Sequence, residues 1–354
     1  MNDILPFLKQ LLSAPGLSGY EDPVRQIIQD AWQPLSDEIA VSRLGSLHAL
    51  KRGRGSQPRR KVMLSAHMDA IGMMVTGIQD GLLRFTKVGG IDSRILPGQL
   101  VTVHGRRDLP AIVVQPPAFL LPEEAAAGPV EMQYLLVDTG LRPQEVDELV
   151  RVGDVISFAQ APLELSGGAV SGHTLDNRVS VAAVTICLDL LQRRAHDWDV
   201  WAVATSQEEE TLAGALTSPV EIQPDMAIVI DVCFAKGLGG SDWRSMELGK
   251  GVGLAWGPNI HPALYKAMQA KAEELEIPYV RDLTPRMSGT DAMGIQVVQS
   301  GIPCVVLGIP LRYMHTPVET VSLKDIKRVG RLMAEFISDL PPEFMDTITW
   351  EEKS

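Results

Sequence analysis

The sequence predicts an α/β protein whose chain is interrupted by a small inserted all-β module. Two observations lead to this fold class. At both ends of the chain, buried strand-like runs alternate with amphipathic helices. Between them, short strand-like runs are separated by turns rich in glycine, proline and aspartate, which is typical of a small barrel or sandwich. With 354 residues and 45% hydrophobic content, the chain can bury one large core or two ordinary ones.

The N-terminal segment contains the first helices and strands of the α/β part. A capping box of Ser18 and Glu21 is expected before the second helix, which has Pro23 in its first turn. A buried strand then leads directly to His67, with Asp69 two residues further on. The expected helices are residues 4–12 and 23–32, and the expected strands are residues 38–43, 47–51 and 61–66.

The inserted module is expected to consist of short strands and one helix. Its strands are bounded by turn sequences such as those at residues 79–81, 88–90 and 152–154. The expected strands are residues 73–78, 82–87, 99–104, 111–115, 134–138 and 154–158, and the expected helix is residues 143–150.

After residue 172 the alternation of helices and buried strands returns. A long helix is expected over residues 177–193, and a final one over residues 322–340, capped by Ser322 with Asp325 three residues on. The other expected elements are strands at residues 200–205, 226–230, 279–280 and 302–309, helices at residues 262–275 and 290–298, and a loop at residues 311–317.

The composition excludes several classes of partner. The formal net charge of -12 disfavours nucleic acid and anionic membranes, because both require a basic surface. Asp3 and Pro6 do not fit a signal peptide, and no apolar run is long enough to span a membrane.

Cys187, Cys233 and Cys304 lie far apart in apolar runs, which indicates buried reduced thiols. We therefore expect a cytoplasmic protein with neither a nucleic-acid nor a membrane partner.

Several buried runs end in residues of the kinds that bind divalent cations. Since ligands bind at the carboxyl ends of strands in open α/β sheets, these side chains are expected at one edge. A buried carboxylate is costly unless its charge is matched, so one cation or a pair of cations is indicated. Histidine and carboxylate ligands without thiolates suit Zn²⁺, Co²⁺ or Mn²⁺. The residues are His67, Asp176, Glu208, Glu209, Asp231 and His315.

Five short motifs occur in an order that resembles a known family of enzymes. They are His67-Met-Asp69-Ala-Ile-Gly72, Leu175-Asp176-Asn-Arg178, Gln207-Glu208-Glu209, Ile230-Asp231-Val232 and Arg312-Tyr-Met-His315-Thr-Pro-Val-Glu319. Together they resemble the cocatalytic-metal aminopeptidases, the family of glutamyl aminopeptidase and tetrahedral (TET) aminopeptidase, some of whose members carry the name endoglucanase M. The resemblance extends over nearly the whole chain.

The resemblance implies two divalent metal ions per chain, with Zn²⁺ or Co²⁺ expected first and Mn²⁺ as a further option. One ion would be held by His67, Asp176 and Asp231. The other would be held by Asp176, Glu209 and His315, so that Asp176 bridges the two. The peptide after the bridging aspartate is cis in some relatives, which makes Asp176–Asn177 a candidate cis bond.

The resemblance also assigns the catalytic roles. Glu208 would be the general acid/base acting on a metal-bridged water, and Asp69 would orient His67. The implied reaction is the removal of N-terminal residues from short peptides. The preferred N-terminal residue stays open, because acidic, aliphatic and basic preferences all occur among the proteins that this chain resembles.

The architecture implied by the resemblance has two domains. Residues 1–72 and 163–354 would form a discontinuous, mixed-sheet α/β/α metallopeptidase catalytic domain. Residues 73–162 would form an inserted barrel-like β domain that serves dimerisation and substrate access, with assemblies from dimers to dodecamers.

The chain departs from the family pattern at three places. Glu210 and Thr211 follow the paired glutamates, where Val-Gly is usual, and Glu210 is expected to face solvent. Ser46 stands where Asn is common, and the stretch 114–118 lacks the histidine that often follows its Pro-Pro. The last departure bears on subunit contacts.

Two other functions fit parts of the sequence. A glycoside hydrolase would use Glu208 with a second carboxylate and no metal, but it leaves His67 and His315 without a role, and the 5% aromatic content offers no evident glycan platform. A non-catalytic assembly scaffold of the same fold is disfavoured by the presence of every implied ligand.

Overall fold

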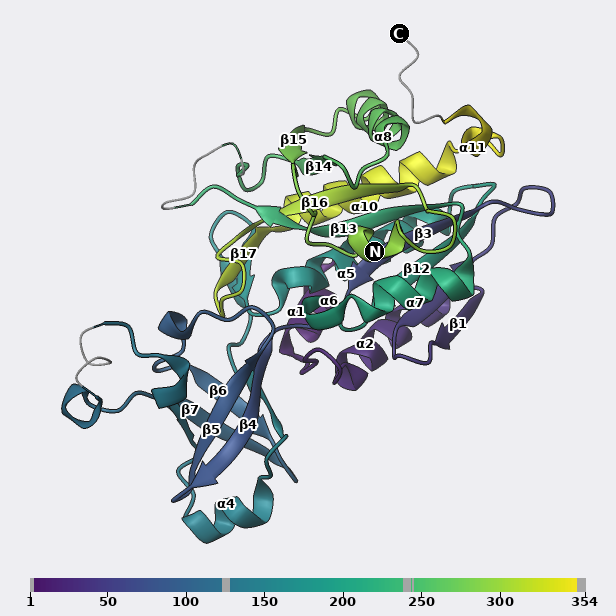
Figure 1. Ribbon diagram of the computed structural model, residues 1–354. Coiled ribbons are helices and arrows are strands. Elements are labelled where there is room, and N and C mark those ends of the chain that lie inside the picture. Colours follow the sequence, from purple (N-terminus) through teal and green to yellow (C-terminus); the bar gives the residue numbers. More distant parts are fainter. Residues whose placement is uncertain (1–2, 123–127, 238–242, 244, 349–354) are drawn as a thin grey trace.

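The computed structural model describes residues 3–122, 128–237, 243 and 245–348, and it divides into a large α/β layer structure and a small barrel (Figure 1). The helices are α1 Leu5–Ser13, α2 Asp22–Trp32, α4 Pro143–Leu149, α5 Leu175–Leu191, α6 Glu208–Thr211, α7 Ala213–Ile222, α8 Pro262–Glu274, α9 Ala292–Ile295, α10 Leu323–Ser338 and α11 Phe344–Thr347. Short 3-10 turns are η1 Gln33–Leu35, η2 Ser93–Ile95, η3 Ala118–Leu120 and η4 Met132–Tyr134.

The strands belong to two separate sheets. The large sheet contains β1 Glu38–Val41, β2 Leu47–Lys51, β3 Lys61–His67, β10 Leu163–Leu165, β11 Ala169–Gly172, β12 Asp199–Thr205, β13 Met226–Phe234, β14 Val252–Trp256, β15 Tyr279–Leu283, β16 Cys304–Arg312 and β17 Glu319–Ser322. The barrel contains β4 Gly72–Gln79, β5 Leu82–Val88, β6 Leu100–His104, β7 Asp108–Val114, β8 Leu136–Asp138 and β9 Val155–Phe158.

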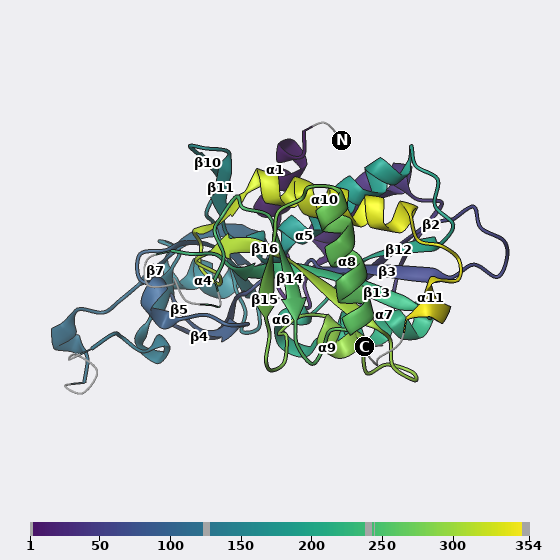
Figure 2. The same ribbon diagram turned by 90° about the horizontal axis from the view of Figure 1, so that it is seen from above.

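The large sheet is mixed, and helices cover both of its faces. Its 11 strands follow the order β1-β2-β12-β3-β13-β16-β17-β11-β10, with β14 and β15 attached beside β16. The central strands β12, β3, β13 and β16 are parallel, so their carboxyl ends lie at one edge. Seen from above, α1 and α10 lie on one side of the sheet, and α7 and α9 lie on the other (Figure 2). This confirms the predicted α/β class.

Helix α5 forms the centre of one layer, and this explains why most of its residues after Arg178 are apolar. Its residues from Leu175 to Leu188 are all buried, between the sheet and the outer helices. Helix α10 packs against it through a mainly apolar face. Gly330 allows the close approach, because a Cβ there would lie 2.7 Å from the Ile186 side chain.

The barrel has a hydrophobic core of its own. Its six strands close in the order β4-β5-β8-β7-β6-β9, and their inward side chains, such as Val75, Val103 and Ile156, are buried. The barrel strands span residues 72 to 158, between β3 and β10 of the large sheet. The inserted β module is therefore confirmed, and the domain boundaries at residues 72 and 163 stay predictions.

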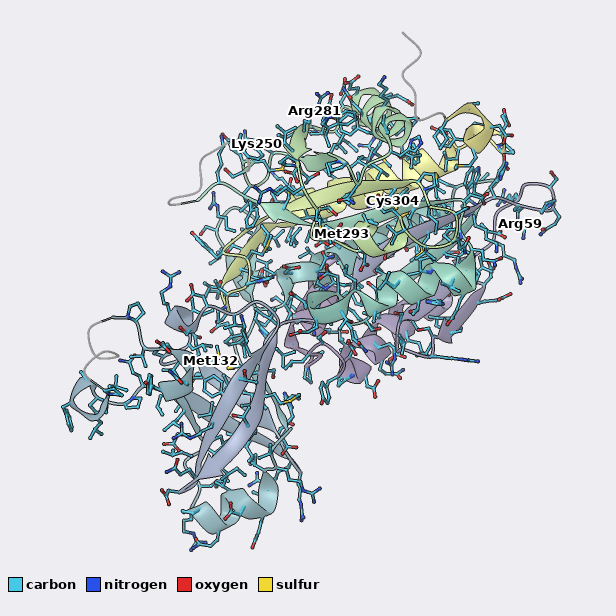
Figure 3. All side chains as sticks on the ribbon, in the orientation of Figure 1. Arg59, Met132, Lys250, Arg281, Met293 and Cys304 are labelled. Carbon is cyan, nitrogen blue, oxygen red and sulfur yellow. The ribbon has the colours of Figure 1, made fainter. Side chains whose placement is uncertain are left out.

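The barrel lies at the end of the large sheet where the parallel strands finish. In Figure 3, Cys304 at the start of β16 and Arg59 just before β3 lie far from Met132 of the barrel. Arg59 belongs to the basic loop between β2 and β3, and its guanidinium donates to Asp199 at 2.6 Å.

No helix among the described residues is long and apolar enough to cross a membrane.

Several sequence predictions need correction. Ser18 and Glu21 form no capping box, because the Glu21 carboxylate instead accepts N–H groups from Gly19 and Gln207. The predicted helix 290–298 is reduced to the single turn of α9, and β16 continues to Arg312, into the predicted loop. Strands β10, β11, β14 and β17 and helices α6, α7 and α11 were not predicted. The Ser322 cap is confirmed, since its hydroxyl accepts the Lys324 N–H.

Candidate active site

All the candidate ligands meet at the carboxyl edge of the parallel strands. His67 is the last residue of β3, and Asp231 lies in the C-terminal half of β13. Glu208 and Glu209 begin α6, shortly after β12 ends, while His315 lies between β16 and β17. The edge therefore gathers side chains from residues far apart in the chain, as the sequence predicted.

Asp176 lies at the centre of this group. The Asn177 side chain fastens the start of α5 to the sheet by donating to the Ile230 carbonyl at 2.9 Å. The Asp176–Asn177 peptide is cis, as expected from the resemblance. At this point α5 departs from helical geometry, so the Asp176 side chain projects from an irregular first turn.

The two carboxylate oxygens of Asp176 face different histidines. Its Oδ1 lies 3.2 Å from His67 Nε2, and its Oδ2 lies 3.5 Å from His315 Nε2. His67 Nε2 also lies 3.9 Å from an Asp231 oxygen, and His315 Nε2 lies 3.5 Å from a Glu209 oxygen. The structure thus contains two groups of ligand-type atoms that share one aspartate. Ligand atoms of His67, Asp176 and Glu209 all lie within 4.8 Å of one another.

Asp69 anchors the segment that carries both glutamates. Its carboxylate accepts the Glu208 N–H at 3.0 Å and the Glu209 N–H at 3.2 Å. The same carboxylate lies 3.4 Å from His67 Nδ1, a ring nitrogen that also lies 3.2 Å from the Asp69 carbonyl oxygen. Asp69 therefore contacts His67, as the sequence predicted, and it also holds the start of α6, which the sequence did not predict.

Glu208 is positioned beside the histidine of the first group. Its Oε2 lies 3.7 Å from His67 Nε2, and its side chain is 10% exposed. Burial raises the pKa of Glu208 to about 10, and the carboxylates of Asp231 and Asp291 add to the rise while His67 opposes it. A cation placed nearby would lower this pKa again.

The pKa values of Glu209, Asp231 and His315 show the same effect of buried negative charge. Burial and the neighbouring Asp176 raise the pKa of Glu209 to about 7. Burial also raises the pKa of Asp231 well above its ordinary value. The hydrogen bond to Asp176 raises the pKa of His315 to about 9. The site therefore stabilises positive charge strongly.

A model of the M42 glutamyl aminopeptidase family matches residues 45–332. The chain belongs to this family. It is 34% identical over 342 residues to the lysyl aminopeptidase of Pyrococcus furiosus, and the alignment covers 95% of this chain and 97% of that protein. M42 membership establishes that the chain is a peptidase, a hydrolase of peptide bonds. It confirms the resemblance inferred from the motifs.

Solved structures show the same M42 fold. A TET aminopeptidase from the marine sediment archaeon Thaumarchaeota archaeon SCGC AB-539-E09 superposes with a TM-score of 0.93 at 29% identity, covering 98% of this chain and 99% of that one. The TET1 peptidase of Pyrococcus horikoshii, described as assembling into a tetrahedron or a large octahedral shell, superposes with a TM-score of 0.83 at 29% identity, covering 96% and 100%.

Sequence reasoning missed two buried carboxylates at this M42 site. Glu319 accepts the Asp176 N–H at 3.0 Å and the His315 N–H at 2.9 Å, so it holds the backbone of two candidate ligands. Asp291 accepts the hydroxyls of Ser65 and Thr205 at 2.7 and 2.6 Å. Glu319 ends the last of the five motifs, but only the tertiary contacts show what Glu319 and Asp291 bind.

Replacing Glu319 by glutamine is expected to lower the free energy of unfolding by about 1–3 kcal/mol. An amide has one oxygen acceptor and turns its NH₂ toward the second N–H, so one buried donor loses its partner. Denaturant unfolding of Glu319→Gln, beside Glu148→Gln on the exposed face of α4, measures this. Equal stability of the two variants would contradict the anchoring role.

Proposed function

We propose that this M42 peptidase is a dinuclear metal-dependent aminopeptidase that removes N-terminal residues from short peptides. The observation that carries the proposal is the geometry of Asp176, whose two oxygens face His67 and His315 separately. A carboxylate shared between two ligand groups can bridge the closely spaced cations of a two-metal site. In this proposal His67, Asp176 and Asp231 hold one cation, and Asp176, Glu209 and His315 hold the other.

The donor set fits such a pair. It consists of imidazole nitrogens and carboxylate oxygens with no thiolate, which suits Zn²⁺ or Co²⁺, with Mn²⁺ as a further option. Glu208, Glu209 and Asp231 are buried, and burial and neighbouring carboxylates raise their pKa values, so their charges are incompletely compensated by protein groups. Two dications would supply that compensation.

The proposed chemistry assigns a proton-transfer role to Glu208. When bound, the cations would lower the pKa of water and polarise the scissile carbonyl. Glu208 would take a proton during attack on the carbonyl and give it to the leaving amine. Asp69 would keep Glu208 in place through the backbone of α6. Carboxylates at this edge that are not engaged by a cation would accept hydrogen bonds from the free α-amino group of a peptide, which supports cleavage after its first residue.

The alternatives account for less of the geometry. A glycoside hydrolase needs two carboxylates and no metal, and it gives no function to the histidines that face Asp176. A scaffold without activity would not require Glu208 to be buried beside His67. The aminopeptidase proposal uses every one of these groups.

Replacing Glu208 by glutamine is expected to lower kcat by about 10²–10⁴-fold while metal content stays unchanged, because the amide cannot accept the proton. Hydrolysis of a panel of aminoacyl-p-nitroanilides by metal-loaded wild type, metal-loaded Glu208→Gln and chelator-treated wild type measures this. Wild-type rates in the variant, or full activity after chelation, would refute the mechanism. Hydrolysis of a β-glucan by the chelated protein would favour the glycosidase alternative.

The number of bound metal ions per chain is expected to differ between the wild type and two ligand variants. The wild type should retain about two ions per chain. Asp176→Ala should lose both, because this side chain faces both groups, whereas Asp231→Ala should retain about one. Elemental analysis after gel filtration measures the content, with the exposed Asp147→Ala of α4 as control. Equal losses in both ligand variants would contradict a shared aspartate.

We also propose that the protein acts in the cytoplasm and self-associates through the barrel, as a dimer or a larger assembly up to a dodecamer. Support for the compartment comes from the free, buried thiols of Cys187, Cys233 and Cys304. Support for assembly comes from apolar side chains on the outside of the barrel: Leu100 is 62% exposed and pairs with Ile112, which is 39% exposed. The P. horikoshii relative is itself an assembly.

Replacing Leu100 by aspartate is expected to reduce the size of the assembly, because a charge in an apolar interface must be desolvated. Light scattering coupled to gel filtration, at matched protein concentration, measures the mass of the particles. Thr86→Asp, which adds the same charge at an exposed position of β5, is the control. An unchanged mass in Leu100→Asp would exclude this face of the barrel.

A further inference from the structure

A hydrogen bond joins helix α6, which carries both glutamates of the site, to the inserted barrel. The Glu210 carboxylate accepts the N–H of Gly89 at 2.5 Å. Glu210 directly follows Glu209 in α6, and Gly89 directly follows β5 of the barrel. Glu210 is exposed, as the sequence predicted, but its carboxylate is engaged with the barrel rather than only with solvent.

The barrel turn that Glu210 holds lies against His315. A Cβ built on Gly90 would lie 2.6 Å from His315 Nδ1 and 2.9 Å from its Cε1, so the Gly90 backbone touches the imidazole edge. The opposite ring nitrogen, Nε2, faces Asp176 and Glu209. The ring therefore stands between the barrel turn and the two carboxylates.

Two further contacts restrict this region. A Cβ on Gly89 would lie 2.5 Å from the Ile71 side chain, so the turn packs tightly on the segment that enters the barrel. The His315 N–H donates to Glu319, which fixes the backbone of the histidine but leaves its ring orientation to its neighbours. The ring neighbour supplied by the barrel is Gly90.

We propose that Glu210 is a positioning residue that holds the Gly89–Gly90 turn against His315, so that the inserted barrel sets the orientation of this imidazole. The inference rests on the proposed function, in which His315 is a metal ligand. Two residues of helix α6 would then act at the same cation site. Glu209 supplies an oxygen directly, and Glu210 acts on the imidazole through the barrel turn. Valine, the residue usual at this position in the resembling family, has no carboxylate and cannot make this bond.

The test compares Glu210→Val with Glu210→Gln, which keeps an oxygen acceptor. Hydrogen exchange of the segment 82–92 reports the Gly89 N–H, and a chelator titration reports the dissociation constant of each of two Zn²⁺ ions. We expect Glu210→Val to exchange about tenfold faster and to bind one of the two ions about tenfold more weakly, the low end of the effect of losing a hydrogen bond to a charged group. Glu210→Gln should lie close to wild type in both measurements.

A second variant tests the turn itself. Gly90→Ala places a methyl group where the His315 ring stands, so it should weaken the same ion although Glu210 is intact. Gly77→Ala is its control in the barrel, because a Cβ there has no atom nearer than 3.8 Å. If Glu210→Val and Gly90→Ala both bind the two ions as wild type does, the positioning role is wrong.

The outcomes separate this proposal from the proposed function. Unchanged Gly89 exchange in Glu210→Val shows that the bond does not hold the turn, whether or not metal binds. Faster exchange with both Zn²⁺ constants unchanged shows that the turn does not position His315. Failure of the wild type itself to bind Zn²⁺ overturns the dinuclear site and with it this proposal.

Discussion

The arrangement of the site depends on buried carboxylates that accept backbone N–H groups. Asp69 accepts two such bonds from the start of α6, and Glu319 accepts one from Asp176 and one from His315. Each carboxylate joins segments that are far apart in the chain. Because these bonds fix the backbone beneath the candidate ligand side chains, they help to determine which oxygen and nitrogen atoms converge. Removing one would leave a buried donor or acceptor without a partner.

The position of the insert follows from the sheet. The chain leaves β3 at the carboxyl edge, where the candidate ligands gather, and enters β4 of the barrel a few residues later. The turn after β5 then returns to that edge and contacts Glu210 and His315. A module inserted at this point necessarily borders the site, because the carboxyl edge is where loops meet in an α/β sheet. The barrel is therefore part of the wall of the site.

Much of the fold was predictable because its signals are local. The buried run before His67, the long apolar helix after Asp176 and the turn-punctuated barrel strands each carry their pattern within a short window. The predictions failed where a distant partner competes with a local one. Ser18 and Glu21 have the spacing of a capping box, yet Glu21 bonds the Gln207 N–H, nearly two hundred residues away. Strand β17 is only four residues long, and it forms a strand because it pairs with β11 and β16.

The sequence by itself determined the order of the motifs, the types of ligand atoms and the presence of an inserted β module, because residue identity and periodicity are properties of the chain. Only the tertiary structure decided that Asp176 divides its oxygens between His67 and His315, that Glu319 anchors both backbones, and that Glu210 reaches Gly89. Except for the bond from the His315 N–H to Glu319, these contacts join residues far apart in the chain. They depend on sheet register and on the packing of loops at one edge, and no local pattern encodes either.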